Sequence, residues 1–80
     1  MQVSLTGPLR SAAGGAADVE ISARTIRELL ARLVESYPDM NDHMEQGIAV
    51  SVDGTMYRDD WDVQIPEGVE VVLLPRIQGG

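Results

Sequence analysis

The sequence predicts an α+β domain in which one main helix packs on one face of a mixed sheet of four to five strands. Two observations support this prediction. Residues 25–36 carry apolar side chains at helical spacing, whereas five shorter segments have the alternating or continuously apolar pattern of strands. Their order is strand, strand, helix, strand, strand and final strand, within 80 residues. A chain of this length has room for one core, so residues 1–80 are expected to form a single domain.

The first two strands are expected to form a hairpin. Residues 2–6 alternate polar and apolar side chains, and Gly7 and Pro8 end that pattern. Residues 9–17 are rich in alanine, serine and glycine and are predicted to be a connecting turn. Residues 18–22 alternate again and are predicted to be the second strand. The two glycines at 14 and 15 lack the lysine of a phosphate-binding loop, so we interpret them as turn residues.

The helix has the clearest signal in the chain. Thr25 is a favourable N-cap, and Glu28 three residues later completes a capping box. Glu28 and Arg32 are also spaced for an ion pair between successive turns. The sequence Tyr37-Pro38 is predicted to end the helix, because the residue before proline is driven out of the α region. The apolar stripe of this helix, which must pack on the sheet, consists of Ile26, Leu29, Leu30, Leu33 and Val34.

A second hairpin follows a polar stretch. Residues 39–46 are predicted to be irregular or a single turn, and His43 within them is expected to be a surface residue rather than a metal ligand. Residues 48–52 and 55–57 are predicted strands, because Asp53-Gly54 between them is a strong two-residue hairpin signal.

The chain then passes through an acidic stretch into its last strand. Residues 58–65 place three carboxylates around Trp61 but lack the pattern of a calcium loop, so we expect solvated turn residues with Trp61 covering the core edge. The turn 66–68 leads into residues 69–74, a near-continuous aliphatic run typical of a central strand buried on both faces. Its natural neighbour is the first strand. Pro75 is expected to end the pairing, since it has no N–H to donate.

Composition and charge exclude several classes of function. The net charge of −7 disfavours binding to nucleic acid and to anionic membrane surfaces, and favours a partner with a basic surface. The acidic run of residues 53–70 is either a docking surface or a solvated hairpin. All six cationic residues are arginine, so there is no lysine for a Schiff base or an isopeptide bond. The absence of cysteine excludes disulfides and thiol chemistry and favours a cytoplasmic protein, and no leader or membrane span is predicted.

The element order is that of a β-grasp domain, and several motifs resemble the MoaD/ThiS family of ubiquitin-like sulfur carriers. The residues that carry the resemblance are Val50-Ser51-Val52-Asp53-Gly54, Pro66-Glu67-Gly68-Val69-Glu70-Val71, Leu73-Leu74-Pro75 and the terminal Gly79-Gly80. Arg58-Asp59-Asp60-Trp61 is similar to the thiamine-type carriers, whereas Leu73-Leu74-Pro75 is more like the molybdopterin type. The pathway that receives the sulfur is therefore left open.

The resemblance implies a function for the last six residues. A ThiF/MoeB-like activating enzyme would use ATP to adenylate the Gly80 carboxylate, and sulfur from a donor protein would convert it to a thiocarboxylate. Gly79 would let the chain enter a narrow channel, because it has no Cβ. The residues expected to contact the partner are Pro75, Arg76, Ile77 and Gln78, in a flexible tail over 75–80.

The same resemblance implies that the chain is not an enzyme by itself, although it could be the small subunit of a synthase with a large-subunit partner. It implies no bound cofactor and no metal. Two other functions stay open, a ubiquitin-like modifier that forms amide bonds through Gly80, and an interaction module whose two glycines are incidental.

Overall fold

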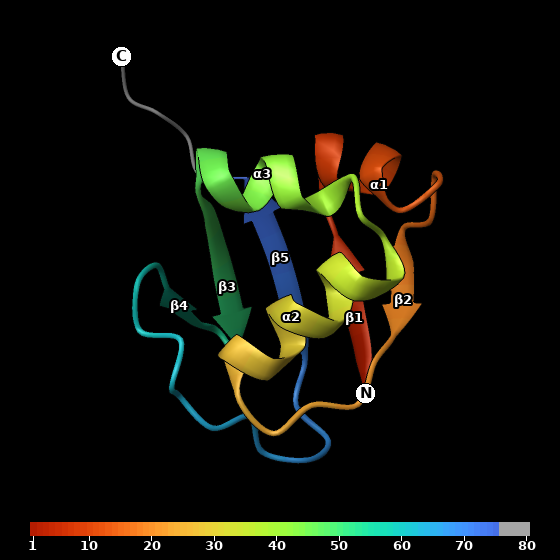
Figure 1. Ribbon diagram of the computed structural model, residues 1–80. Helices are drawn as coiled ribbons and strands as arrows, with labels where there is room; N and C mark the ends of the chain where they lie inside the picture. The colour runs from red at the N-terminus through yellow and green to blue at the C-terminus, as the bar shows by residue number, and fades with distance from the viewer. Residues whose placement is uncertain (76–80) are drawn as a thin grey trace.

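A five-stranded mixed sheet forms one layer of the molecule, and three helices cover one of its faces (Figure 1). The computed structural model describes residues 1–75. The strand order is β2-β1-β5-β3-β4, with β1 and β5 parallel and the other neighbours antiparallel. The last strand therefore lies at the centre beside the first, which confirms the predicted α+β architecture. The strands are β1 (Gln2–Leu5), β2 (Asp18–Glu20), β3 (Ile48–Val52), β4 (Thr55–Tyr57) and β5 (Val71–Pro75).

Helix α2 (Ile26–Ser36) forms as the sequence predicts. The Glu28 amide donates to Thr25 Oγ1 at 3.2 Å, and Glu28 Oε1 accepts from the Arg24 amide at 3.1 Å. Arg32 Nε lies 3.7 Å from Glu28 Oε1, which confirms the expected ion pair. The helix ends at Ser36, directly before Tyr37 and Pro38.

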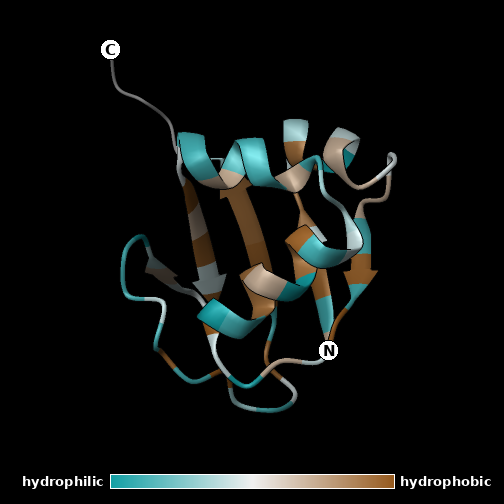
Figure 2. Cartoon of the chain, in the orientation of Figure 1, coloured by the Kyte–Doolittle hydropathy of each residue, from teal (hydrophilic) through white to brown (hydrophobic). Residues whose placement is uncertain are grey.

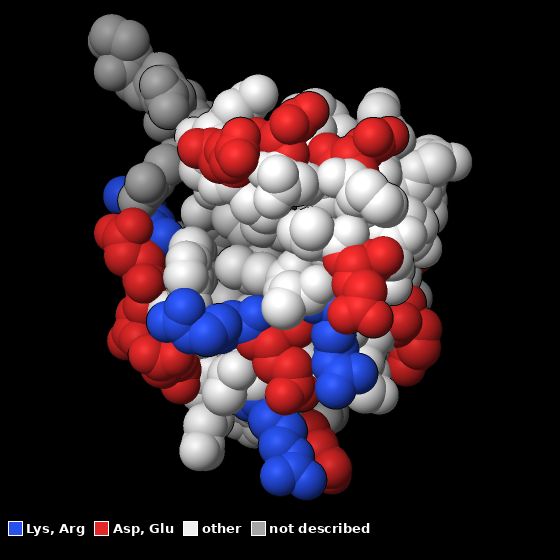
Figure 3. Space-filling view, in the orientation of Figure 1, with Lys and Arg blue, Asp and Glu red and all other residues white. Residues whose placement is uncertain are grey.

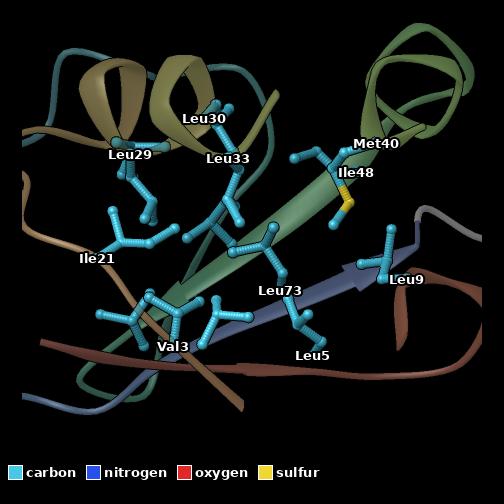
Figure 4. Close-up of a cluster of buried hydrophobic side chains, with 14 of the residues drawn as sticks. Val3, Leu5, Leu9, Ile21, Leu29, Leu30, Leu33, Met40, Ile48 and Leu73 are labelled. Carbon is cyan, nitrogen blue, oxygen red and sulfur yellow. The ribbon is translucent and has the colours of Figure 1, made fainter. Parts of the chain in front are cut away.

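The core lies between the sheet and the helices. Figure 4 shows side chains from the strands and from all three helices converging there, and Figure 2 shows that β5 is hydrophobic over most of its length. Among residues 1–75, no polar or charged residue is fully buried. The side chains that are fully buried are Val3, Leu5, Leu9, Ile26, Leu29, Leu33, Met40, Val50, Val71 and Leu73.

Two short helices replace segments that we predicted to be irregular. Helix α1 (Pro8–Ala12) lies in the predicted turn over 9–17, and helix α3 (Met40–Gln46) lies in the polar stretch 39–46. Each is too short to show a helical period in the sequence. Each is held by burial of a few side chains, since Leu9 and Met40 are both 0% exposed. The tertiary core therefore decides these two helices.

The structure also corrects the boundaries of three strands. β1 ends at Leu5 and β2 at Glu20, which is one and two residues earlier than predicted. β5 begins at Val71 and includes Pro75, which pairs with Ile48, so the prediction that pairing stops before Pro75 is wrong.

Pro75 is tolerated in this central strand because of the direction in which its N–H would point. The Asp53 amide donates to the Glu70 carbonyl at 2.9 Å. Hydrogen-bonded pairs alternate along an antiparallel ladder, so every second residue of β5, counted from Glu70, exchanges hydrogen bonds with β3. The backbone groups of Leu73 and Pro75 therefore point away from β3, toward β1. Since β1 ends at Leu5, which pairs with Leu73, no strand lies beside Pro75 on that side to need its N–H.

The turn between β3 and β4 and the segment that follows β4 agree with the sequence predictions. Asp53 and Gly54 have φ of 51° and 85°, the two positive values of a type I′ turn. Trp61 is half-buried and packs against the core, as expected.

The segment around Trp61 has a further role that the sequence did not suggest. The carbonyls of Trp61 and Val63 accept hydrogen bonds from Arg27 and Ile26, at 2.7 and 3.1 Å, and so satisfy the first amides of α2.

Candidate functional site

The predicted site residues follow the central strand of the sheet. Pro75 is the last residue of β5, whereas Arg76, Ile77, Gln78, Gly79 and Gly80 lie outside the described residues. The structure therefore places Pro75, the residue after which the segment with the predicted reactive Gly80 carboxylate begins. Gly80 is the fifth residue after Pro75, and at about 3.4 Å per residue an extended segment of that length reaches at most about 17 Å. A partner that acts on Gly80 must work within that distance of Pro75.

The end of β5 is held by the segment that links β1 to α1. Thr6 follows the end of β1, and its Oγ1 donates to the Leu73 carbonyl at 3.1 Å on the side of β5 that faces β1. Gly7 follows with φ of 55°, and a Cβ there would lie 3.7 Å from Pro75 Cγ. Arg10 Nε donates to the Leu5 carbonyl at 3.0 Å, which fixes the start of α1 against β1. These contacts fix the position of the C-terminal end of β5.

The face of the sheet opposite the helices carries a small apolar surface beside this point. Leu74 is opposite Ala49, and Val72 and Met56 are both opposite Ser51 across β3. Met56 is 48% exposed, the largest exposure of any bulky apolar side chain in residues 1–75. We call Ala49, Met56, Val72 and Leu74 the open-face patch; Ala49 is only 7% exposed, so the other three supply its accessible surface. Val72 and Leu74 are only partly buried, so the prediction that β5 is buried on both faces is wrong.

Carboxylates lie at the same end of the molecule. Asp39, Asp42 and Glu45 are exposed along and just before α3, and Figure 3 shows acidic side chains over that helix at the top of the view. Helix α3 is joined through Gly47 to Ile48, the residue that pairs with Pro75. Acidic side chains therefore lie on the α3 side of this end of the molecule, in keeping with the preference for a basic partner surface that the net charge indicates.

The described residues contain little that could perform chemistry. No group of three or more His, Asp or Glu side chains within residues 1–75 is placed to hold a metal ion. Arg27 Nε donates to Asp62 Oδ1 at 2.9 Å, and this hydrogen bond together with the charge of Arg27 holds the pKa of Asp62 below its usual value. That exposed pair joins the first turn of α2 to the acidic stretch that follows β4. None of the helices in residues 1–75 has the length and hydrophobicity needed to cross a bilayer.

A family model, described as the ThiS family, matches residues 3–80. The chain belongs to the ThiS family. The match covers nearly the whole ThiS-family chain and includes the two terminal glycines. No curated protein matches it at a significant level.

Several solved structures share the fold of this ThiS-family protein. CysO of Mycobacterium tuberculosis is 21% identical with a TM-score of 0.77, over 95% of this chain and 98% of CysO. CysO in the Amycolatopsis orientalis BexX/CysO complex is 22% identical with a TM-score of 0.78, over 99% and 98%. A putative molybdopterin converting factor, subunit 1, from Pyrococcus furiosus is 20% identical with a TM-score of 0.77, over 95% of each chain. At these identities the likeness establishes the β-grasp, ubiquitin-like fold.

Two features near the site were not found from the sequence. The open-face patch was not predicted, because the continuous aliphatic run in β5 indicated burial on both faces of the sheet. The structure shows that helices cover only one face, so Val72 and Leu74 on the other face are partly exposed. The contact from Thr6 to Leu73 joins residues 67 apart in the sequence, and no local pattern indicates it.

Proposed function

We propose that this chain is a sulfur carrier whose Gly80 carboxylate is activated by a partner enzyme and converted to a thiocarboxylate. The observation that carries the proposal is the family match, which extends from residue 3 through Gly79 and Gly80. The position of β5 supports it, because a central strand held on both sides leads directly into those last residues.

The chemistry divides between the two proteins. An oxygen of the Gly80 carboxylate attacks the α-phosphorus of ATP on the activating enzyme, pyrophosphate leaves, and an acyl adenylate forms. Sulfide then attacks the acyl carbon, AMP leaves, and loss of the sulfur-bound proton gives the thiocarboxylate. The carrier supplies the carboxylate and its unobstructed approach, since Gly79 has no Cβ to block a narrow channel. It supplies no general acid or base, so the catalyst is the partner and the chain is a co-substrate.

The open-face patch is the surface that we expect the activating enzyme to contact. With Gly80 at most about 17 Å from Pro75, the body of the enzyme must lie against the domain near the end of β5. Leu74 and Val72 are on that strand, and Ala49 and Met56 extend the apolar surface across β3 and β4. The acidic residues of α3 suit an enzyme with a basic rim around its channel. Arg76, Ile77 and Gln78 would contact that channel directly.

The test is intact mass spectrometry of the protein incubated with ATP, an activating enzyme of the ThiF/MoeB type and a sulfide source. We expect a gain equal to the difference between sulfur and oxygen, and its loss when Gly80 is deleted. Urea unfolding of the deletion variant checks that the fold is intact. A gain that survives the deletion would contradict the proposal, and no gain with any such enzyme would favour an interaction module.

A ubiquitin-like modifier that forms amide bonds through Gly80 is the second candidate. The fold is shared with small archaeal modifier protein 1 from Methanosarcina acetivorans, with a TM-score of 0.75 and 21% identity over 99% of this chain and 94% of that protein. The two functions use the same adenylate and differ in the nucleophile. Affinity-tagged protein recovered from cells separates them, because a modifier accumulates as adducts on target lysines and a sulfur carrier as the free thiocarboxylate.

A further inference from the structure

The outer strand β2 has backbone groups that no other strand uses. It is the end strand of the sheet and pairs only with β1. The Leu5 amide donates to the Ala17 carbonyl at 2.8 Å, and Ile21 and Met1 exchange hydrogen bonds, each of 3.0 Å. Because hydrogen-bonded pairs alternate along an antiparallel ladder, Asp18 and Glu20 must point their N–H and C=O groups outward. The edge therefore offers two donors and two acceptors in strand geometry.

A groove lies at the C-terminal end of this edge, between residues 20–22 and α2. Its volume is about 590 Å³; Ile21 and Ala31 are its apolar lining residues, and the other six, among them Glu28, Arg32 and Glu35 of α2, are polar or charged. Ile21 lies on the helix side of the sheet and is only 8% exposed. Ala31 lines the groove from α2, and its side chain is only a methyl group. There is thus space for side chains between the strand and the helix.

We propose that this edge and groove bind an extended segment of a partner protein, which adds to the sheet as a strand beside β2. The fold itself gives the sequence preference of that segment. Residues opposite each other in neighbouring strands point to the same face of the sheet. A side chain opposite Ile21 enters the groove beside Ala31 and should be small and apolar, and one opposite Val19 lies on the same face of the sheet. Side chains opposite Asp18 and Glu20 lie on the helix-free face beside two carboxylates and should be basic.

The charges along the edge select this occupant over a second copy of the chain. Asp18 accepts a hydrogen bond from Ser4 Oγ at 3.0 Å, and Glu20 forms an ion pair with the Met1 ammonium group at 3.0 Å, so Asp18 and Glu35 are the carboxylates here that form no ion pair within residues 1–75. No arginine within residues 1–75 forms an ion pair with Asp18, Glu20 or Glu35. Two β2 edges side by side would bring these carboxylates together, and like charges directly opposite destabilise a strand pair. An alternating basic and apolar segment instead pairs with them.

This surface is separate from the proposed sulfur-carrier site. β1 lies between β2 and β5, so at about 4.8 Å per strand the free edge is about 10 Å or more from the strand that leads to Gly80. The two surfaces therefore share no strand. The proposal does not depend on whether Gly80 carries sulfur.

The test is a titration of the ¹⁵N-labelled chain with an acetylated, amidated seven-residue peptide of alternating arginine and valine, followed by amide hydrogen exchange. We expect shifts at β2 and at Ala31 and Glu35, and slower exchange of the Asp18 and Glu20 amides. That protection is specific to strand addition, because these two amides have no ladder partner in the free protein. A peptide of alternating glutamate and valine should bind at least about tenfold more weakly, since its carboxylates would face Asp18 and Glu20.

Two variants make the test specific. Asp18→Lys should weaken the arginine–valine peptide about tenfold, whereas Glu67→Lys, the same charge change at an exposed turn, should have a much smaller effect. Ala31→Arg should block the groove without touching the core. Equal weakening by the two lysine variants, binding without protection of Asp18 and Glu20, or no shift at millimolar peptide would each overturn the proposal.

Discussion

Two neighbouring leucines in β5 provide the sharpest check on the structure. Leu73 is 0% exposed and faces the helices, whereas Leu74 is half-buried and belongs to the open-face patch. The two residues differ only in the face of the sheet on which the backbone places them. Leu73→Ala should therefore cost stability, and Leu74→Ala should cost partner binding.

The expected size follows from burial. Replacing a fully buried leucine by alanine costs about 2–5 kcal/mol, a large share of the roughly 5–15 kcal/mol by which a domain is stable. For a domain of this size the melting temperature should fall by roughly 10–30 °C. Leu74→Ala leaves a smaller gap on a face that water already reaches, so we expect a loss of about 1 kcal/mol.

Urea unfolding followed by fluorescence measures both variants, because Trp61 packs against the core and reports its loss. The activation assay with ATP and a ThiF/MoeB-type enzyme is the second measurement. If the open-face patch contacts the enzyme, Leu74→Ala should raise KM about tenfold with little change in kcat. Equal loss of stability in the two variants would refute the register of β5. An unchanged KM in the stable Leu74→Ala protein would refute the docking surface while leaving the register intact.

Three further predictions concern the scaffold. Thr25→Ala should lower the free energy of unfolding by about 1 kcal/mol, because it removes the acceptor of the Glu28 amide, and a loss near zero in urea unfolding would contradict that role. Gly54→Ala should cost about 1–2 kcal/mol at its φ of 85°, measured in the same way, and a neutral result would argue against the type I′ turn. Asp62 has its pKa lowered by Arg27, so its contribution to stability is present above the unfolded pKa of about 3.9 and is lost as pH falls through the folded value. In the Asp62→Asn variant the melting temperature should therefore fall less steeply as the pH is lowered through that acidic range. If the variant and the original protein show the same dependence of melting temperature on pH, the Arg27–Asp62 pair is not a source of acid sensitivity.

Local signals in the sequence were enough for the main helix and for the second hairpin. The capping residues and the apolar stripe of α2 act within a few residues of one another, and Asp53-Gly54 sets its turn by backbone preference alone. The same holds for the family resemblance, whose terminal glycines are a property of the sequence. These features could be predicted because their causes are short-range.

The sequence by itself determined the α+β class and the central place of the last strand, whereas the single domain and the residues of the tail stay predictions. Only the tertiary structure decided that Leu9 and Met40 hold two short helices, that Val72 and Leu74 face away from the core, and that Pro75 remains in the sheet beside Ile48. The physical reason is that burial and strand pairing depend on neighbours far away in the chain. Whether an aliphatic residue in β5 is covered depends on which face the helices occupy, and a proline is accepted where the adjacent strand has already ended.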